Sequence, residues 1–348
     1  MNEPAEGGTP AGAGPTDTDW AAALAAVRGL PADARVQLIC HVNPDGDALG
    51  SMLGFGLGLR RLGVRQLRAT FPGPPVLPEP FRWLPGLELL VPQDDAYPEP
   101  DLVICFDAAS ESRLGDLADR LDKAGAALVL DHHASNTRFG GIHLVDPHAA
   151  ATSVVAQELL DRLGVPLDAE IATCFYVALS TDTGSFRFEA TTPAVHRLAA
   201  RLLATGIRPG DISRRIFDTR PFGAVRLFGE VMLRARLEPA AAAGRGLVWT
   251  YATREDLAHH DQPAYVLEAL IDSVRCTAEA DVSCVVKQVD TAEWAVSLRS
   301  KGAVDVSAVA VALGGGGHRF AAGFTGRGTV DEVVERIRGE LAGALLPG

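Results

Sequence analysis

Short apolar runs alternate with longer amphipathic stretches along the first half of the chain. The runs VQLIC, LVICF and ALVL, at residues 36–40, 102–106 and 127–130, have the length and composition of buried strands. The intervening stretches carry apolar residues at helical spacing and predict helices over residues 19–30, 46–63, 113–125 and 151–164. This alternation predicts an α/β fold with a doubly wound, mostly parallel sheet.

The pattern changes towards the C-terminus. Residues 190–236 are helical and rich in arginine, and beyond residue 245 the strand-like runs GLVWTYA, ADVSCVVKQV and EWAVSLRS alternate with helices. We therefore expect a second, smaller α/β domain. The predicted organisation is a disordered tail over residues 1–18, a larger domain over 19–189, a helical connector over 190–236 and a C-terminal domain over 237–346.

Composition narrows the classes of function. A formal net charge of −12 over 348 residues argues against a long nucleic-acid track, which needs clustered Lys and Arg. Five cysteines without CxxC spacing fit buried free thiols in a reducing compartment. The first 18 residues lack the features of a signal peptide and no apolar stretch reaches membrane-spanning length, so we expect a cytoplasmic protein with no membrane partner.

Three of the apolar runs end in polar residues that can bind metal. Ligands bind at the carboxyl ends of the strands in open α/β sheets, so these residues should meet at one edge. A further aspartate follows the apolar stretch IATCFYVAL and could reach the same edge. The candidates are His41, Asp45 and Asp47 after the first run, Asp107 after the second, Asp131, His132 and His133 after the third, and Asp182.

The ligand types indicate the metal. Carboxylates and imidazoles without a cysteine suit Mn²⁺ or Mg²⁺ better than structural zinc. Two ions about 3.5–4 Å apart, bridged by one carboxylate and a hydroxide, would account for so many ligands and would create a nucleophile at neutral pH. We therefore expect two Mn²⁺ per chain, with Mg²⁺ as a substitute, and phosphoester hydrolysis as the reaction.

Five segments give the sequence a family resemblance. HVNPDGDALGS, FDAAS, DHHASN, STDTGSFRF and GGGGHRFAAG occur in this order, and together they resemble the DHH phosphoesterase superfamily over residues 19–345. The branch that the chain resembles most degrades very short RNAs and dephosphorylates 3′-phosphoadenosine 5′-phosphate (pAp). The resemblance implies that Asp107 bridges the two ions, that Asp131 orients His132 and that His133 faces the scissile phosphate. The implied ligands are His41, Asp45 and Asp107 for one ion, and Asp47, Asp107, His132 and Asp182 for the other.

The same resemblance assigns substrate binding to the C-terminal domain. The glycine run before His318 would form an anion cradle if a helix-like segment followed it. Thr152 and Ser153 match a stretch that opens a helix, and we expect them only to cap it. The expected substrate-binding residues are Gly315, Gly316, Gly317 and His318 in the cradle, Arg299, Ser300 and Lys301 in a basic motif, and Arg275.

These inferences predict a manganese-dependent hydrolase of RNAs of about two to five nucleotides that also converts pAp to AMP. The alternative is a phosphodiesterase for cyclic di-AMP or its linear product pApA, and the residues leave both open. A single-strand DNA exonuclease is less favoured because of the net acidity, and a non-catalytic nucleotide sensor because every ligand position is filled. The expected partners are short RNA, dinucleotides and nucleotides, and a homodimer is a possible assembly.

Overall fold

The structure, a computed structural model, describes residues 13–346. The chain forms two compact units, Met1–Thr219 and Arg220–Gly348, which we call unit 1 and unit 2. The division falls inside the stretch expected as a connector: α6 (Pro193–Leu203) and α7 (Pro209–Ile216) belong to unit 1, and α8 (Phe222–Leu233) belongs to unit 2. Of the expected N-terminal tail, residues 1–12 lie outside the described residues, and helix α1 (Asp17–Arg28) begins before the tail was expected to end.

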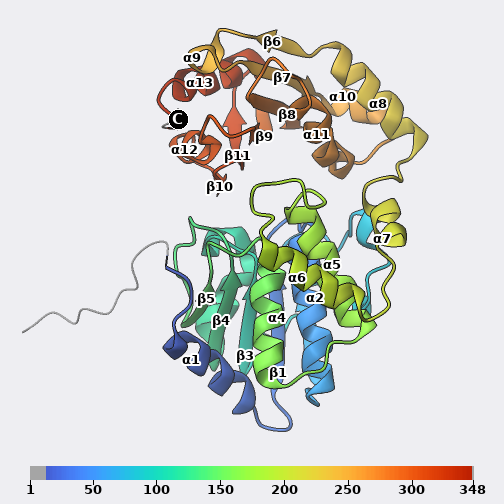
Figure 1. Cartoon of the computed structure of the whole chain (residues 1–348), viewed down its shortest axis with the longest axis vertical. Helices are drawn as coiled ribbons and strands as arrows, with labels where there is room; N and C mark the ends of the chain where they lie inside the picture. The colour runs from blue at the N-terminus through green and yellow to red at the C-terminus, as the bar shows by residue number, and fades with distance from the viewer. Residues whose placement is uncertain (1–12, 347–348) are drawn as a thin grey trace, which may run out of the picture. The chain divides into compact units, whose positions relative to one another are not determined.

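Unit 1 contains a five-stranded sheet in the order β2-β1-β3-β4-β5, and all four neighbouring pairs are parallel (Figure 1). The predicted fold class is confirmed. The patterns did not predict the two edge strands, which are short and only partly buried at their ends. The strands are β1 (Arg35–Cys40), β2 (Gln66–Thr70), β3 (Leu102–Phe106), β4 (Ala126–Asp131) and β5 (Ile142–Val145).

Successive side chains of a strand point to opposite faces of the sheet, so alternate positions of these strands are buried in two separate apolar cores, one on each face. On β3, Ile104 and Phe106 join the larger core, while Val103 and Cys105 join the core on the other face. Helices α1, α2 (Gly46–Arg61), α4 (Thr152–Leu163) and α5 (Ala169–Asp182) cover the larger core. The other face is covered by a 3₁₀ segment, Glu111–Leu117, and the short helix α3 (Asp119–Lys123). The single helix expected over 113–125 is thus wrong, because Gly115 breaks it with a φ of 50°.

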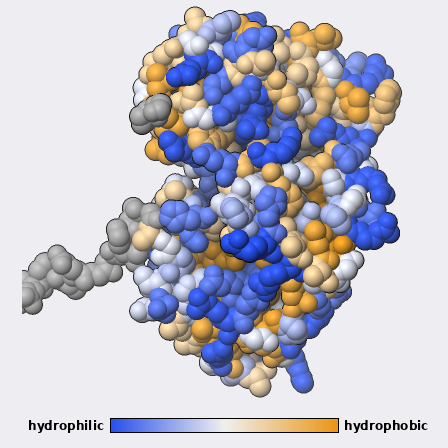
Figure 2. Space-filling model, viewed as in Figure 1, coloured by the Kyte–Doolittle hydropathy of each residue, from blue (hydrophilic) through white to orange (hydrophobic). Residues whose placement is uncertain are grey.

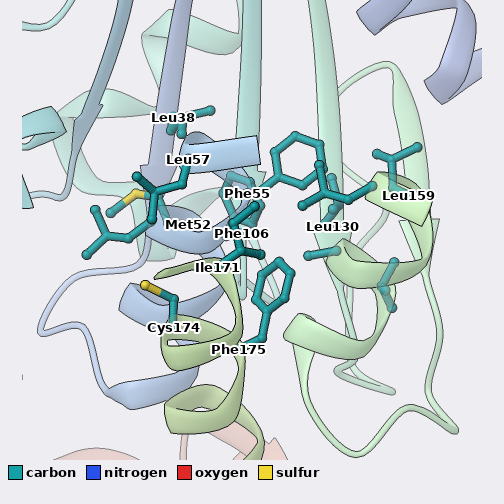
Figure 3. Close-up of a cluster of buried hydrophobic side chains, with 14 of the residues drawn as sticks. Leu38, Met52, Phe55, Leu57, Phe106, Leu130, Leu159, Ile171, Cys174 and Phe175 are labelled. Carbon is teal, nitrogen blue, oxygen red and sulfur yellow. The ribbon is translucent and has the colours of Figure 1, made fainter. Parts of the chain in front are cut away.

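Close packing of α2 against α5 explains the glycines in α2. A Cβ atom on Gly54 would lie 2.7 Å from the ring of Phe175, and one on Gly50 would overlap the carbonyl oxygen of Cys174. Figure 3 shows Phe55, on the sheet side of α2, beside Phe106 of β3; their ring centroids are 5.6 Å apart. This packing fixes the first turn of α2 relative to the last turn of α5.

Unit 2 contains a six-stranded mixed sheet in the order β10-β11-β9-β8-β7-β6, in which β7 and β8 are parallel and all other neighbours antiparallel. Trp249 and Trp294 are buried in its core. The strands are β6 (Arg236–Glu238), β7 (Leu247–Ala252), β8 (Val282–Asp290), β9 (Glu293–Ser300), β10 (Gly316–His318) and β11 (Ala321–Arg327). The remaining helices are α9 (Ala241–Gly244), α10 (Arg254–His259), α11 (Leu270–Arg275), α12 (Val306–Ala312) and α13 (Val330–Leu341).

Hydrophilic residues cover much of the surface seen in Figure 2, with smaller hydrophobic areas between them. Within residues 13–346, none of the helices combines the length and the apolar character that crossing a bilayer requires. Four of the five cysteines are buried free thiols, as expected, but Cys276 is exposed.

Candidate metal centre

The carboxyl ends of β1, β3 and β4 bring the predicted metal ligands of unit 1 together. His41 directly follows β1, and Asp107 directly follows β3. Asp131 is the last residue of β4, so His132 and His133 extend from the same edge of the sheet. The other ligands come from helix ends: Asp45 is the N-cap of α2, Asp47 lies in its first turn, and Asp182 is the last residue of α5.

Asp107 lies between two groups of ligands. Its Oδ2 atom is 3.5 Å from Nε2 of His41, and its Oδ1 atom is 3.6 Å from Nε2 of His132. One oxygen of this carboxylate therefore faces each imidazole, which is the arrangement that a bridging ligand needs.

Further carboxylates complete the two groups. Asp45 Oδ1 lies 3.8 Å from His41 Nε2, whereas Asp47 Oδ2 and Asp182 Oδ2 lie 3.6 Å and 3.1 Å from His132 Nε2. Two ligand atoms about 2.1 Å from one ion are about 3.0–3.5 Å apart when they subtend 90–110°. The separations in the structure are close to this range, so the residues fit a divalent cation in each group.

Backbone carbonyls orient both imidazoles. Nδ1 of His41 lies 2.8 Å from the carbonyl oxygen of Val42, and Nδ1 of His132 lies 3.1 Å from that of Ala149. A carbonyl oxygen only accepts, so each Nδ1 carries the proton and donates it. This tautomer leaves the Nε2 lone pair directed at the carboxylates, as metal binding requires.

Asp131 has a different partner from the one expected. Its Oδ1 atom accepts a hydrogen bond from Nδ1 of His133 at 2.7 Å, while its Oδ2 atom accepts one from Nδ2 of Asn136 at 2.6 Å. The expectation that Asp131 orients His132 is therefore wrong. Burial lowers the pKa of His133, but the Asp131 carboxylate outweighs it and raises that pKa, so the pair favours a protonated imidazole.

Electrostatic repulsion is strong within the cluster. Burial, followed by the charges of Asp107 and Asp182, raises the pKa of Asp47 well above its ordinary value. Burial lowers the pKa of His41, but the carboxylates of Asp107 and Asp45 outweigh it and raise the pKa to about 10. The cluster thus takes up protons when no other cation is present, because buried like charges need compensation.

The backbone of Asp107 is strained. Its φ of 57° lies in the left-handed region, which residues with a side chain adopt rarely. The Asp107 N–H nevertheless donates to the carbonyl oxygen of Leu130 at 3.0 Å, which extends the pairing of β3 with β4. Such strain is typical of residues whose side-chain direction matters for function.

Three residues that the sequence did not assign to the site hold its carboxylates. The hydroxyl of Thr152 donates to Oδ1 of Asp107 at 3.0 Å, and the Thr152 N–H donates to Oδ2 of Asp47 at 2.6 Å. Ser51 Oγ and Ser153 N donate to Oδ1 of Asp47 at 2.8 Å and 3.2 Å. The capping role expected for Thr152 and Ser153 is wrong, since Ala151 is the N-cap of α4 and no side chain caps that helix. A threonine after small residues gave no signal for this role.

In unit 2 the glycine run forms a hairpin. Gly316, Gly317 and His318 make up β10, which pairs antiparallel with β11, and the element that directly follows His318 is this strand rather than a helix. The helix-like cradle expected here is therefore wrong. Gly315 packs so closely against β11 that a Cβ atom would overlap the carbonyl oxygen of Gly323. Gly317 has a φ of 137°, so both positions require glycine for backbone reasons.

The predicted substrate-binding residues of unit 2 other than the glycines differ in their surroundings. Arg299 on β9 is in register with Ala321 on β11, which is in register with His318, so these residues lie on one line across the sheet. Ser300 is buried and donates its hydroxyl to Asp281 Oδ2 at 2.8 Å, and Lys301 Nζ donates to the carbonyl oxygen of Thr277. The structure thus gives Ser300 and Lys301 partners within unit 2. Arg275 is the last residue of α11.

Comparison with known proteins identifies the family. Residues 35–179 match the DHH family, N-terminal domain, and residues 250–343 match the DHHA1 domain. A protein from Thermus thermophilus named bifunctional oligoribonuclease and PAP phosphatase NrnA is 36% identical over 89% of this chain and 91% of its own length. The chain belongs to the DHH family. A Bacillus subtilis protein of the same name is 26% identical over 81% of this chain and 86% of its own.

The DHH family match contains every candidate ligand except Asp182, which lies three residues beyond its end and is placed by α5. Arg275, Arg299 and His318 fall within the DHHA1 match. A crystal structure of an exopolyphosphatase-related protein from Bacteroides fragilis has a TM-score of 0.82, with 24% identity over 94% of this chain and 96% of that chain. That likeness shows a shared fold.

Proposed function

We propose that this DHH-family protein is a metal-dependent phosphoesterase that hydrolyses RNAs of about two to five nucleotides to mononucleotides and converts pAp to AMP. The observation that carries the proposal is the placement of Asp107, with one oxygen toward His41 and the other toward His132. A bridging carboxylate between two imidazole-containing groups suits a pair of divalent cations, which we propose to be Mn²⁺.

The residues around Asp107 divide into those that would hold the ions and those that would act on the substrate. His41, Asp45 and Asp107 would hold one ion, and Asp47, Asp107, His132 and Asp182 the other. Bound divalent cations would supply activated water and neutralise charge on the phosphate oxygens.

His133 would act on the leaving oxygen. The Asp131 carboxylate accepts a hydrogen bond from Nδ1–H of His133 and a second one from the side-chain amide of Asn136. These two hydrogen bonds in series fix the orientation of the His133 ring. Nε2 of the protonated ring is then the atom that can donate a proton to the departing oxygen. Asp131 thus acts as a positioning residue for His133 in this proposal.

Two observations favour short nucleotides as substrates. The NrnA relatives are named oligoribonuclease and PAP phosphatase, and their similarity to this chain extends over 81–89% of its length. The net charge of −12 gives a long polyanion little to bind outside the site. Arg299 and His318, in line across the unit 2 sheet, are the residues that we propose to bind the nucleotide.

The proposal is tested by comparing specificity constants for pApA, pAp, cyclic di-AMP and a 20-nucleotide RNA in one preparation. We expect turnover of pApA and pAp with Mn²⁺, none after EDTA treatment, and weak activity on the 20-mer. Preference for cyclic di-AMP would support the cyclic-dinucleotide phosphodiesterase instead, and equal turnover of pApA and the 20-mer would support an exonuclease. Turnover that survives EDTA would contradict the metal-dependent mechanism.

A further inference from the structure

Arg113 lies beside the candidate metal centre and has no part in the assignments above. It belongs to the 3₁₀ segment Glu111–Leu117, three residues after Ser110, which ends the FDAAS motif. Its carbonyl oxygen accepts a hydrogen bond from Val42 N at 2.9 Å, and its own N–H donates to Ser110 O at 3.0 Å. The backbone of Arg113 is therefore fixed to the loop that connects His41 to Asp45.

The Arg113 guanidinium lies close to the His41 ring, but this ring offers it no acceptor for a hydrogen bond. Nη2 of Arg113 is 3.1 Å from Nδ1 of His41, but the same Nδ1 is 2.8 Å from the carbonyl oxygen of Val42. The carbonyl can only accept, so Nδ1 donates its proton there and has no lone pair to offer Arg113. The donors of this guanidinium consequently require an acceptor from elsewhere.

No carboxylate supplies that acceptor. Within residues 13–346, Arg113 has no ion pair within 4.0 Å, although Asp45 and Asp107 lie that close to the ring of the same histidine. Some arginines of unit 1 are paired with carboxylates, as Arg61 is with Asp168 at 2.8 Å and Arg201 with Asp161 at 2.9 Å. Arg113 is exposed, so its charge reaches the solvent at the edge of the centre.

The charge of the centre explains why a cation is useful there. The four carboxylates proposed as ligands would balance two divalent cations, and Asp131 is paired with His133, so little net positive charge would remain to attract an anionic phosphoester. An arginine on the solvent side supplies this attraction, and its planar fork of donors matches two phosphate oxygens.

We propose that Arg113 binds phosphate oxygens of the substrate from unit 1, at the His41 and Asp45 end of the centre. The inference rests on the proposed function, because it names a further substrate-binding residue of the same site. The ligand class is a phosphate mono- or diester, for which AMP is the probe.

The test compares Arg113→Gln, Arg113→Lys and Arg65→Gln in the Mn²⁺-loaded full chain. Arg65 is an exposed arginine just before β2, at the opposite edge of the sheet, and serves as the matched control. Because one charge-assisted hydrogen bond is lost, we expect Arg113→Gln to weaken AMP binding in calorimetry and to raise KM for pApA by about 10- to 100-fold. kcat should change less, the lysine variant should recover part of the loss, and Arg65→Gln should match the wild type.

Three outcomes would overturn the inference. Unchanged AMP affinity and KM in Arg113→Gln would show that the side chain does not bind phosphate. A fall in manganese content together with affinity would mean that Arg113 supports His41 rather than the substrate. Failure of the wild type to bind AMP would exclude a phosphate site here. A wild type that binds AMP but does not hydrolyse pApA would contradict the proposed function alone, and the comparison of AMP affinities would still decide the role of Arg113.

Discussion

Buried charge is arranged differently in the two units. In unit 2, Arg234 contacts the carboxylate of Asp256 at 2.7 Å and 2.9 Å, and Lys287 Nζ contacts Glu268 at 2.6 Å. In unit 1, no lysine or arginine of residues 13–346 lies within 4.0 Å of a carboxylate of the metal centre, whose polar neighbours are imidazoles, hydroxyls, amides and backbone N–H groups.

The difference distinguishes carboxylates that are neutralised by a basic side chain from carboxylates that have no such partner. A buried carboxylate that is paired with arginine is already neutralised, so it needs nothing from solution. The carboxylates of unit 1 repel one another, and only an added cation or proton relieves the repulsion. Burial alone therefore does not identify a site, whereas buried charges of one sign that the protein leaves uncompensated do.

The largest effect that tests this comparison should come from Asp107→Ala. Removing the carboxylate that faces both imidazoles should release both metals and reduce turnover of pApA below about one thousandth of the wild-type rate. Metal content is measured by elemental analysis beside the activity assay. Asp116→Ala, which removes an exposed carboxylate from the following 3₁₀ segment, should have little effect. Two tightly bound Mn²⁺ per chain in Asp107→Ala would show that Asp107 is not the bridge.

His318→Ala should separate substrate binding from metal chemistry. Loss of one contact that positions the nucleotide should cost on the order of 10²-fold in turnover of pApA. A small diester such as bis-p-nitrophenyl phosphate needs only the metals, so its hydrolysis should be largely spared. Asp182→Ala is the control, because loss of a proposed metal ligand should depress both substrates together. Parallel loss of both activities in His318→Ala, with metal content intact, would place His318 in the chemical step.

Thr152→Val should weaken metal binding, but less than Asp107→Ala does. The substitution keeps the size of the side chain and removes the hydroxyl that donates to Asp107 at 3.0 Å. Groups that hold a metal ligand by a hydrogen bond are typically worth about 10- to 100-fold in metal affinity. A Mn²⁺ titration measures the change. Thr173→Val is the matched control, because within residues 13–346 the hydroxyl of Thr173 donates only to the carbonyl oxygen of Ala169 in its own helix. Equal Mn²⁺ affinity in the two variants would remove Thr152 from the support of the centre.

The sequence predicted the elements that carry the chemistry but not the contacts among them. The apolar runs before His41 and Asp107 end where β1 and β3 end, and the run before Asp131 ends one residue before the end of β4. They agree because a buried parallel strand leaves a strong hydrophobic signal. The partner of Asp131 and the hydroxyl of Thr152 depend on side-chain direction in three dimensions, for which the spacing of residues gives no signal.

The glycine run shows the same limit in unit 2. A run of glycines before a histidine is compatible with a helix start and with a hairpin, and the choice depends on pairing with β11. Arg113 was not identified because its significance lies in the absence of a carboxylate partner, which only the structure reveals.

The smallest effect concerns Asp256, the paired carboxylate of unit 2. Burial raises its pKa, but hydrogen bonds from Arg234 and Thr253 outweigh burial and lower the pKa below its ordinary value. The pair therefore contributes stability at pH values above the unfolded pKa of about 3.9, and this contribution is lost as the pH falls through the lower, folded pKa.

Asp256→Asn should lower the free energy of unfolding at pH 7 by about 1–2 kcal/mol, because it replaces a charge-assisted pair with a neutral hydrogen bond. Urea denaturation of the full chain at pH 7 and at pH 3 measures the effect, and the difference between wild type and variant should shrink at the lower pH. Asp272→Asn, an exposed carboxylate on α11, controls for the change in net charge. Metal content and turnover of pApA should stay at wild-type values in Asp256→Asn, since this carboxylate is neutralised within unit 2. A loss of bound metal in this variant would contradict the distinction between paired and uncompensated charge.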